Sequence, residues 1–325
     1  MPTTGDWTVS SALQPKAEDY DFDLDRALAA VVGLRSAVPE DAFTAEVLGT
    51  ERAGNGVLIR SDGLVLTIGY LIVEAESVWL SLSDGRGVAG HVLGYDQESG
   101  FGLVQALARL DLPALPLGES GNAPVGESVV VGGAGGRQRS VAARIAAKQE
   151  FAGYWEYFLD EAIFTAPSHP QWGGSALIGP AGDLLGIGSL QLQREGDGGR
   201  REDLNMIVPI DVLKPILDDL ITLGRPNRPP RPWLGLYATE IEDKVVVAGL
   251  AGQGPAKAAK LRRGDIVLAV NGAQPNGLGD FYRRVWAMGE AGVEVPLSIY
   301  RDGRAVELRV ASADRSRFLR APRMH

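Results

Sequence analysis

Hydrolysis by a protein nucleophile needs that nucleophile, a histidine base within hydrogen-bond reach of it, and a carboxylate that orients the base. The chain of 325 residues holds three histidines. His91 lies in a run typical of a surface strand, and His325 ends the chain. His169 is therefore the candidate base, because Ser168 precedes it and Ser175 follows a short way on.

Metal and cofactor chemistry has no matching pattern in this sequence. Cysteine is absent, which excludes disulfides and thiolate metal sites. Neither His91 nor His169 has a partner at metal-ligand spacing. Residues 131–136 (VGGAGG) follow a predicted strand but lack the lysine and the helix opening of a phosphate-binding loop. We expect no metal and no cofactor.

The element that would position Ser175 is a hairpin within Pro170–Ile187, with a turn at Gly179–Gly182 between two apolar strand segments. This stretch resembles the segment around the nucleophile in trypsin-like serine proteases of the HtrA/DegP family, P-G-N-S-G-G-P-L-V-x-x-x-G-x-x-x-G-I. In that register the nucleophile position falls on Gly173, which has no side chain. The matching positions are Pro170, Gly174, Leu177, Gly182, Gly186 and Ile187.

The other two catalytic positions of the family are also substituted. Residues 54–72 (GNGVLIRSDGLVLTIGYLI) resemble the family's G-S-G-F-I-I-S-x-D-G-x-I-L-T-N-N-H-V-V and place Tyr70 where the family has its histidine. Residues 94–104 (GYDQESGFGLV) resemble G-x-D-x-x-x-D-L-A-L-L and place Gly100 where the family has its aspartate. The resemblance thus implies a protease fold with no catalytic residue left: the degenerate triad positions are Tyr70, Gly100 and Gly173.

A relocated nucleophile is the alternative interpretation. Ser175 lies two residues past Gly173, and on a strand that spacing moves the hydroxyl by roughly 6–7 Å, too far for a base placed as in the family. We interpret Ser175 as filling the family's second glycine position. Gln171 and Trp172 also replace the segment whose backbone N–H groups form the oxyanion hole in the family. Trp172 is expected to plug the cleft or, alternatively, to stack on a ligand.

Short apolar runs separated by turn residues predict a mainly β fold. The resemblance implies a chymotrypsin-like double β-barrel over 25–224, preceded by an arm over 1–24. A stiff proline-rich linker over 225–232 then leads to a PDZ domain, an α+β open barrel, over 233–314, and 315–325 is a basic tail. The runs predicted as barrel strands are Val57–Ile59, Leu64–Thr67, Val78–Leu82, Val88–Leu93, Leu103–Leu107, Val129–Gly136 and Ser140–Ile145.

Two longer segments are predicted to include helix. Asp23–Leu34 begins with acidic residues and continues as an apolar helix or strand. Leu204–Gly224 matches the family's last barrel strand and the helix that closes the barrel, and Gly224 is a C-terminal stop signal. Val212 and Ile216 are expected on the buried face of this helix.

Residues 261–272 (LRRGDIVLAVNG) carry the PDZ resemblance most specifically. A PDZ domain takes an extended peptide as an added strand, and backbone N–H groups bind its terminal carboxylate. The resemblance places this carboxylate-binding loop at Trp233, Leu234, Gly235 and Leu236. It places the facing helix at Leu278–Met288, so an apolar terminal residue is expected. The helix residues expected to receive the last side chain are Phe281, Val285 and Met288.

Aromatic residues gather in two further places. Residues 149–160 (QEFAGYWEYFLD) are expected either to line a ligand pocket near the former active site or to pack as a lid over it. Tyr20 and Phe22 stand where the family has an arm that builds a trimer, so a homo-oligomer, most simply a trimer, is expected. Ordinary packing of these two rings within the chain is the alternative.

The composition argues against two classes of binding partner, nucleic acids and membranes. The net charge of −9, with no basic cluster, argues against nucleic-acid binding, and no apolar run approaches membrane-spanning length. The first residues lack a basic-then-apolar signal pattern, so we expect a cytoplasmic protein, or a periplasmic one if residues have been removed from the start.

Taken together, these patterns predict an HtrA-like pseudoprotease that binds peptides or proteins. Its PDZ domain would hold protein carboxyl termini, and the dead cleft would hold a peptide or act as a scaffold. One alternative is an active serine endopeptidase of protein quality control with a relocated nucleophile. Another is a structural subunit that regulates a larger complex.

Overall fold

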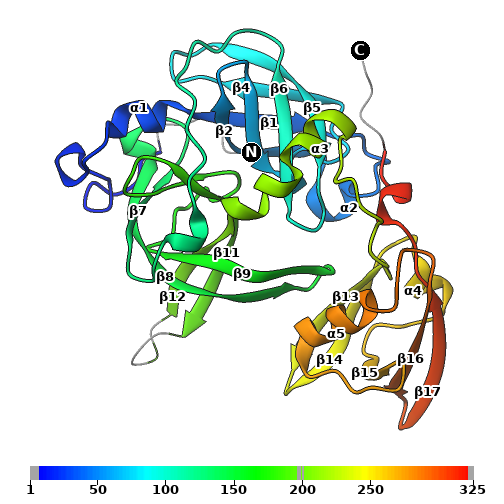
Figure 1. Cartoon of the computed structure of the whole chain (residues 1–325). Helices are drawn as coiled ribbons and strands as arrows, with labels where there is room; N and C mark the ends of the chain where they lie inside the picture. Colours follow the sequence, from blue (N-terminus) through cyan, green and yellow to red (C-terminus); the bar gives the residue numbers. More distant parts are fainter. Residues whose placement is uncertain (1–6, 196–198, 200, 321–325) are drawn as a thin grey trace. The chain divides into compact units, whose positions relative to one another are not determined.

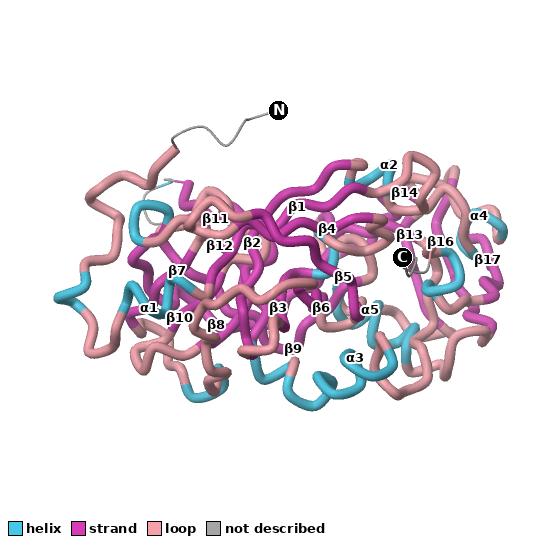
Figure 2. Tube along the Cα trace, turned by 90° about the horizontal axis from the view of Figure 1, so that it is seen from above, coloured by secondary structure: helices cyan, strands magenta, loops and turns pink. Residues whose placement is uncertain are grey.

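The computed structural model describes residues 7–195, 199 and 201–320. The chain divides into two compact units. The first contains the chain up to Gln149 together with Glu161–Asn227, and the second contains Arg228–Arg320 together with the short segment Glu150–Asp160. The second unit is therefore discontinuous in sequence, which the sequence analysis did not anticipate. Strands are the main regular structure of the first unit, and its helices are short (Figure 2).

The first unit contains two closed antiparallel barrels, as expected from the resemblance (Figure 1). The first barrel closes in the order β1-β2-β3-β6-β5-β4, and the second in the order β10-β11-β12-β9-β8-β7. The first comprises β1 (Val31–Ala37), β2 (Glu51–Arg60), β3 (Leu64–Ile68), β4 (Ser77–Ser81), β5 (Gly87–Tyr95) and β6 (Phe101–Ala106). The second comprises β7 (Ser128–Gly132), β8 (Ser140–Gly153), β9 (Tyr157–Ala166), β10 (Ala176–Ile178), β11 (Leu184–Glu195) and β12 (Arg201–Pro209).

The predicted hairpin within Pro170–Ile187 is confirmed as β10 and the start of β11. Leu177 lies opposite Gly186, and the turn between the strands places Gly182 at φ +74°, a conformation that favours glycine. Phe22 covers this turn, because a Cβ added at Gly182 would lie 2.8 Å from its ring. Tyr20 contacts Phe22 with ring centroids 5.4 Å apart. Both arm aromatics are thus packed within the chain, and the trimer remains a prediction.

Among its described residues, the first unit also holds three short α-helices and several 3₁₀ turns. Asp23–Leu34 contains both helix and strand, with the Asp23 carboxylate capping α1 by accepting from the backbone of Arg26 at 3.0 Å. Pro215 lies in a 3₁₀ turn, and Val212 and Ile216 also lie in such turns rather than in the predicted helix. Gly224 ends α3 at φ +71°, as predicted. The α-helices are α1 (Leu24–Ala29), α2 (Ala45–Leu48) and α3 (Leu217–Leu223). The 3₁₀ turns of this unit are η1 (Ala17–Asp19), η2 (Gly69–Leu71), η3 (Ser120–Asn122), η4 (Arg137–Arg139), η6 (Ile210–Val212) and η7 (Lys214–Ile216).

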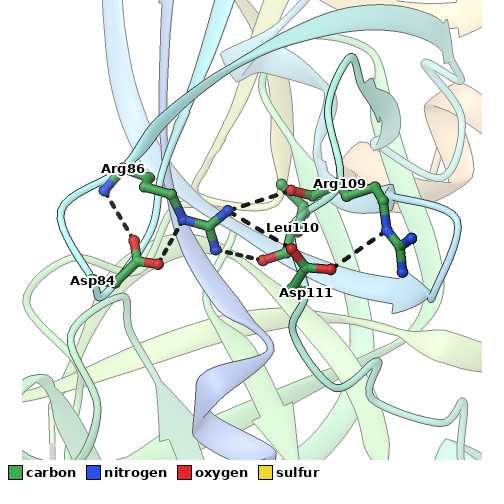
Figure 3. Close-up of polar contacts among 5 residues, drawn as sticks. All are labelled: Asp84, Arg86, Arg109, Leu110 and Asp111. Atoms are coloured by element: carbon green, nitrogen blue, oxygen red, sulfur yellow. Dashed lines mark hydrogen bonds and ion pairs between the residues drawn. The ribbon is translucent and has the colours of Figure 1, made fainter.

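An exposed polar network fastens the β4–β5 turn of the first barrel to the segment after β6 (Figure 3). Arg86 donates to the carboxylate of Asp84 at 2.6 Å and to the carbonyl of Leu110 at 2.8 Å. Asp111 pairs with Arg109 at 3.4 Å on the same surface. Water screens exposed pairs of this kind, so the network fixes the loop more than it stabilises the barrel.

The second unit is built on a five-stranded antiparallel sheet in the order β13-β14-β15-β16-β17, and α5 contacts β13 and β14 (Figure 1). Asp302 and Gly303 both have positive φ, as the tight turn of the predicted β16–β17 hairpin requires. Asp265 is buried and is satisfied by Arg301 and by the backbone of Arg262 at 2.7 Å. The elements are β13 (Leu236–Ile241), β14 (Lys244–Leu250), β15 (Ile266–Val270), β16 (Glu294–Arg301), β17 (Arg304–Ala311), α4 (Pro255–Ala258), α5 (Gly277–Trp286) and η8 (Arg315–Phe318).

Candidate functional site

Tyr70 and Gly173 lie next to each other in the first unit. A Cβ added at Gly173 would lie 2.7 Å from the Tyr70 hydroxyl oxygen, so the tyrosine ring end fills the space of a nucleophilic side chain. The Tyr70 hydroxyl donates to the carbonyl of Ser189 at 2.9 Å. Burial raises the pKa of Tyr70 above its ordinary value, which keeps the phenol protonated and unable to act as a base.

Gly100 meets the same cluster through its backbone. Its carbonyl accepts from the N–H of Gly69, the residue before Tyr70, at 2.6 Å. Gly100 has φ +83° and closes a turn whose carboxylate belongs to Asp96, which accepts from the backbone of Ser99 at 2.9 Å. The structure therefore brings the three degenerate positions into one neighbourhood, and the buried carboxylate nearby caps its own turn.

Arg52 holds the segment that carries Tyr70. Its guanidinium donates to the carbonyls of Tyr70 at 2.8 Å and Val73 at 3.0 Å, and to the Thr44 hydroxyl at 2.8 Å. Glu74 accepts from the same hydroxyl at 2.6 Å. Side chains from three separate segments therefore fix η2, because each buried polar group in this cluster finds a partner.

Asn55 connects the two barrels at the position of the lost nucleophile. Its backbone N–H donates to the carbonyl of Gly173 at 2.8 Å, and its side-chain amide donates to the carbonyls of Gln171 and Gly173 at 3.0 and 3.1 Å. Its side-chain oxygen accepts from the N–H of Ala134 at 2.9 Å. Asn55 is not predicted from the sequence as a functional residue, although Asn55 occupies the middle of GNG where the family has G-S-G.

His169 and Ser175 do not form a catalytic pair. The Ser175 hydroxyl is buried and donates to the carbonyl of Trp172 at 2.8 Å. His169 is fully buried; its Nδ1 accepts from the N–H of Gln171 at 3.0 Å, which leaves Nε2 to donate to the carbonyl of Arg139 at 2.7 Å. Both ring nitrogens are thus engaged with backbone, and the Gln171 N–H is not free to stabilise an oxyanion.

The loop predicted to bind a carboxylate is found at the start of β13, and it holds one. The backbone N–H groups of Leu234, Gly235 and Leu236 donate to the carboxylate of Glu156 at 2.9, 2.7 and 3.1 Å. Gly235 has φ +74°, which turns successive N–H groups toward one point and favours glycine. Trp233 supports the loop from behind, because a Cβ added at Gly235 would meet its ring at 3.0 Å.

Glu156 lies at the tip of the β8–β9 hairpin, in the segment Glu150–Asp160 that belongs to the second unit; we call this segment the tip. The carbonyl of Tyr154 accepts from the N–H of Ala238 in β13 at 2.8 Å, as an added peptide strand would. The Tyr282 hydroxyl of α5 donates to the carbonyl of Gly153 at 2.8 Å. The aromatic tip therefore packs on the PDZ unit, and the expected lid or pocket near the former active site is not its role.

The helix face that meets the tip differs from the predicted one. Phe281 and Val285 are buried in the core of the second unit, and Met288 packs against that core. The contacts with the tip are made by a neighbouring stripe of α5, whose residues follow the i, i+3, i+4, i+7 spacing of one helix face. Phe158 of the tip approaches each of three members of this stripe, and the stripe consists of Gly279, Tyr282, Arg283 and Trp286.

Burial raises the pKa of Glu156 to about 7, while the three N–H donors and the charge of Arg315 act in the opposite direction. The Tyr282 hydroxyl accepts from the Glu156 backbone N–H at 3.2 Å, and burial raises the pKa of Tyr282, so this neighbour stays neutral. The group therefore ionises at a higher pH than an exposed glutamate, and once it is ionised the three N–H groups take the place of its hydration.

Residues 54–187 match the trypsin-like peptidase domain family, and residues 232–311 match the PDZ domain family. The chain is 28% identical over 274 residues to a probable periplasmic serine endoprotease DegP-like of Pseudomonas fluorescens, covering 80% of this chain and 56% of the relative. In sequence and in domain content the chain is similar to proteases of the HtrA/DegP type. It is also 28% identical over 276 residues to the periplasmic pH-dependent serine endoprotease DegQ of Escherichia coli K12, covering 80% of this chain and 59% of that protein.

The chain spans little more than half the length of these curated relatives. Solved structures agree on the fold. HtrA-type protease AlgW with tripeptide has a TM-score of 0.52 at 21% identity, covering 92% of this chain and 97% of that one. AlgW with decapeptide has a TM-score of 0.53 at 21% identity, covering 92% and 98%.

These relatives correct one expectation. The cytoplasmic location inferred from the first residues is contradicted, because the curated relatives are named periplasmic. No helix among residues 7–195 and 201–320 is long and apolar enough to cross a membrane. In the described part of the chain, no three acidic, histidine or cysteine side chains gather as they would around a metal ion.

We predict that Gly173→Ala destabilises the first unit by about 1–3 kcal/mol, because its methyl group would overlap the Tyr70 hydroxyl. Tyr70→Phe removes that hydroxyl and gives the matched background. In Tyr70→Phe the same Gly173→Ala change is expected to cost less, with a coupling of at least about 0.5 kcal/mol between the two sites. Chemical denaturation of the four proteins measures this coupling, and strictly additive effects would contradict the packing.

We predict that His169 makes the first unit acid-sensitive. Burial lowers the pKa of His169 below its ordinary value, so the unfolded chain takes up a proton as the pH falls through about 6.5 while the folded chain does not. The free energy of unfolding should fall by up to about 1.4 kcal/mol per pH unit from this group below that pH. His169→Asn should show a shallower slope between neutral and acid pH in urea denaturation; equal slopes would refute the assignment.

Proposed function

We propose that this chain is a catalytically silent HtrA-type protein that binds the carboxyl termini of peptides or proteins through its PDZ domain. The observation that carries the proposal is the convergence of the Leu234, Gly235 and Leu236 N–H groups on one carboxylate. Hydrogen bonds to an ionised acceptor are roughly twice as strong as neutral ones. A peptide's terminal carboxylate offers the same two oxygens as the glutamate that occupies the loop.

The proposed absence of catalysis is supported by the groups that occupy the former catalytic site. A protonated tyrosine stands in place of the base, and Asn55 ties the carbonyl of Gly173 from the first barrel. Restoring a triad would need a nucleophile, a base and an orienting carboxylate together. Tyr70, Gly100 and Gly173 supply none of the three.

An active enzyme with a relocated nucleophile is less well supported, because the polar side-chain atoms of Ser175 and His169 are hydrogen-bonded to backbone groups. The names of the curated relatives favour a periplasmic location for this chain as well. In that compartment the PDZ domain would meet the carboxyl termini of exported or misassembled proteins. Assembly into a trimer through the arm over 1–24 is part of the same proposal and is compatible with Tyr20 and Phe22 supporting the arm from within.

We predict that a fluorophosphonate probe will not label the purified chain and that unfolded proteins will not be cleaved above background. The triple variant Tyr70→His, Gly100→Asp, Gly173→Ser should recover little activity, because Asn55 and Gln171 still engage the backbone that an oxyanion hole would need. Covalent labelling that disappears in Ser175→Ala or Ser168→Ala would instead establish the relocated-nucleophile enzyme.

We predict that the full chain binds a short peptide ending in valine with a free carboxylate at least about tenfold more tightly than the same peptide with an amidated end, a difference of about 1.4 kcal/mol. The amide lacks the charge that the three N–H groups stabilise. Fluorescence polarisation with labelled peptides measures both affinities. Equal binding of acid and amide would show that the loop is not a carboxylate site for peptides and would favour a structural role for the domain.

A further inference from the structure

Glu156 has a backbone conformation that is unusual for a glutamate. The β8–β9 hairpin turns through Tyr154, Trp155 and Glu156, and Glu156 closes the turn at φ +58°. Three-residue hairpin loops favour glycine at this left-handed position, and a side chain there carries a conformational cost. A residue kept in such a conformation is held by its surroundings, so the contacts of its side chain identify what holds it.

Those contacts leave the Glu156 side chain almost fully enclosed, at 8% exposure. Both carboxylate oxygens accept from the loop, one from Leu234 and the other from Gly235 and Leu236. The Glu156 backbone N–H also donates to the Tyr282 hydroxyl at 3.2 Å. A buried carboxylate is tolerated only when it is fully hydrogen-bonded, and this loop supplies the bonds.

The rest of the tip makes the contacts that a peptide ligand would make with the edge strand and the facing helix. Tyr154 meets the backbone of β13 through Ala238, which is where an added strand would pair. Phe158 packs against α5, with its ring 6.2 Å from that of Trp286 and the Arg283 guanidinium 4.3 Å from its centroid. One segment of the chain thus contacts the carboxylate loop, the edge strand and the facing helix together.

We propose that the tip is an internal ligand of the PDZ domain, in which the Glu156 side chain stands in for a peptide's terminal carboxylate. This inference rests on the proposed function for the identity of the competing ligand. A peptide with a free carboxylate binds only after Glu156 leaves the loop, so its apparent affinity is reduced by the fraction of molecules that are docked. Because β8 and β9 continue from the tip, binding of such a peptide releases the end of a barrel hairpin.

The docking itself is tested by hydrogen exchange on the full chain, without any peptide. Glu156→Gly and Glu156→Asn suit the left-handed turn and shorten or remove the side chain, so the hairpin is retained. Both variants should accelerate exchange of the Leu234, Gly235 and Leu236 amides at least tenfold. Glu161→Gln is the matched control, since Glu161 lies on β9 just beyond the tip and pairs with Lys148 instead of with the loop or α5. Unchanged exchange in both Glu156 variants overturns the proposal.

Competition is tested by titrating the valine-terminated peptide into the same proteins. The two Glu156 variants should bind it at least tenfold more tightly than the native chain and Glu161→Gln. If they bind it no more tightly, the internal ligand does not compete and the proposal fails in that respect. If no protein binds the peptide although exchange accelerates as expected, docking of Glu156 stands and the proposed peptide-binding function fails.

Discussion

The burial of one carboxylate decides how the second unit is built. Moving an ionised group out of water is costly unless hydrogen bonds replace its hydration, and at Glu156 three backbone donors from consecutive residues do so. Those donors converge only because Gly235 takes a left-handed conformation, which residues with a Cβ adopt at a cost. The turn geometry of the tip, the glycine of the loop and the stripe on α5 are therefore parts of one arrangement.

The former protease site follows a different principle. A working triad keeps a polarised set of groups poised in a partly buried cleft, whereas here neutral groups and backbone carbonyls satisfy one another. The side-chain amide and backbone N–H of Asn55 donate to the segment around Gly173. Both ring nitrogens of His169 are hydrogen-bonded to backbone groups. Every polar atom engaged in this way raises the cost of rearranging the site, because breaking a buried hydrogen bond leaves both partners unsatisfied. The region has the character of an inter-barrel seam.

Much of this architecture was predictable from the sequence. The hairpin ending at Ile187, the strands of both barrels and the run around Asp265 carry local signals, namely alternating apolar residues, turn glycines and a fixed motif spacing. Tyr70 and Gly173 were placed together because each belongs to a separately anchored motif. The location was misjudged, because the absence of a leader-like pattern in the first residues carries little information.

The features that sequence reasoning missed depend on contacts between distant segments. Glu156 and Gly235 are separated by 79 positions, and no periodicity in either segment encodes their contact. Asn55 lay inside a recognised motif, yet its role depends on how closely the second barrel approaches. On α5 the face that contacts the tip lies one position away from the predicted residues, since Phe281 and Tyr282 are equally plausible by apolar character and only the packed sheet distinguishes their faces.

The discontinuity of the second unit has a consequence for how the chain is made. Ribosomes add about 5–20 residues each second, so Glu156 emerges about 4–16 seconds before its partner Gly235. During that interval the barrels can close, but Phe158, which packs against α5 in the finished fold, has no surface to cover it. The nascent chain must therefore carry this apolar ring uncovered until α5 is synthesised.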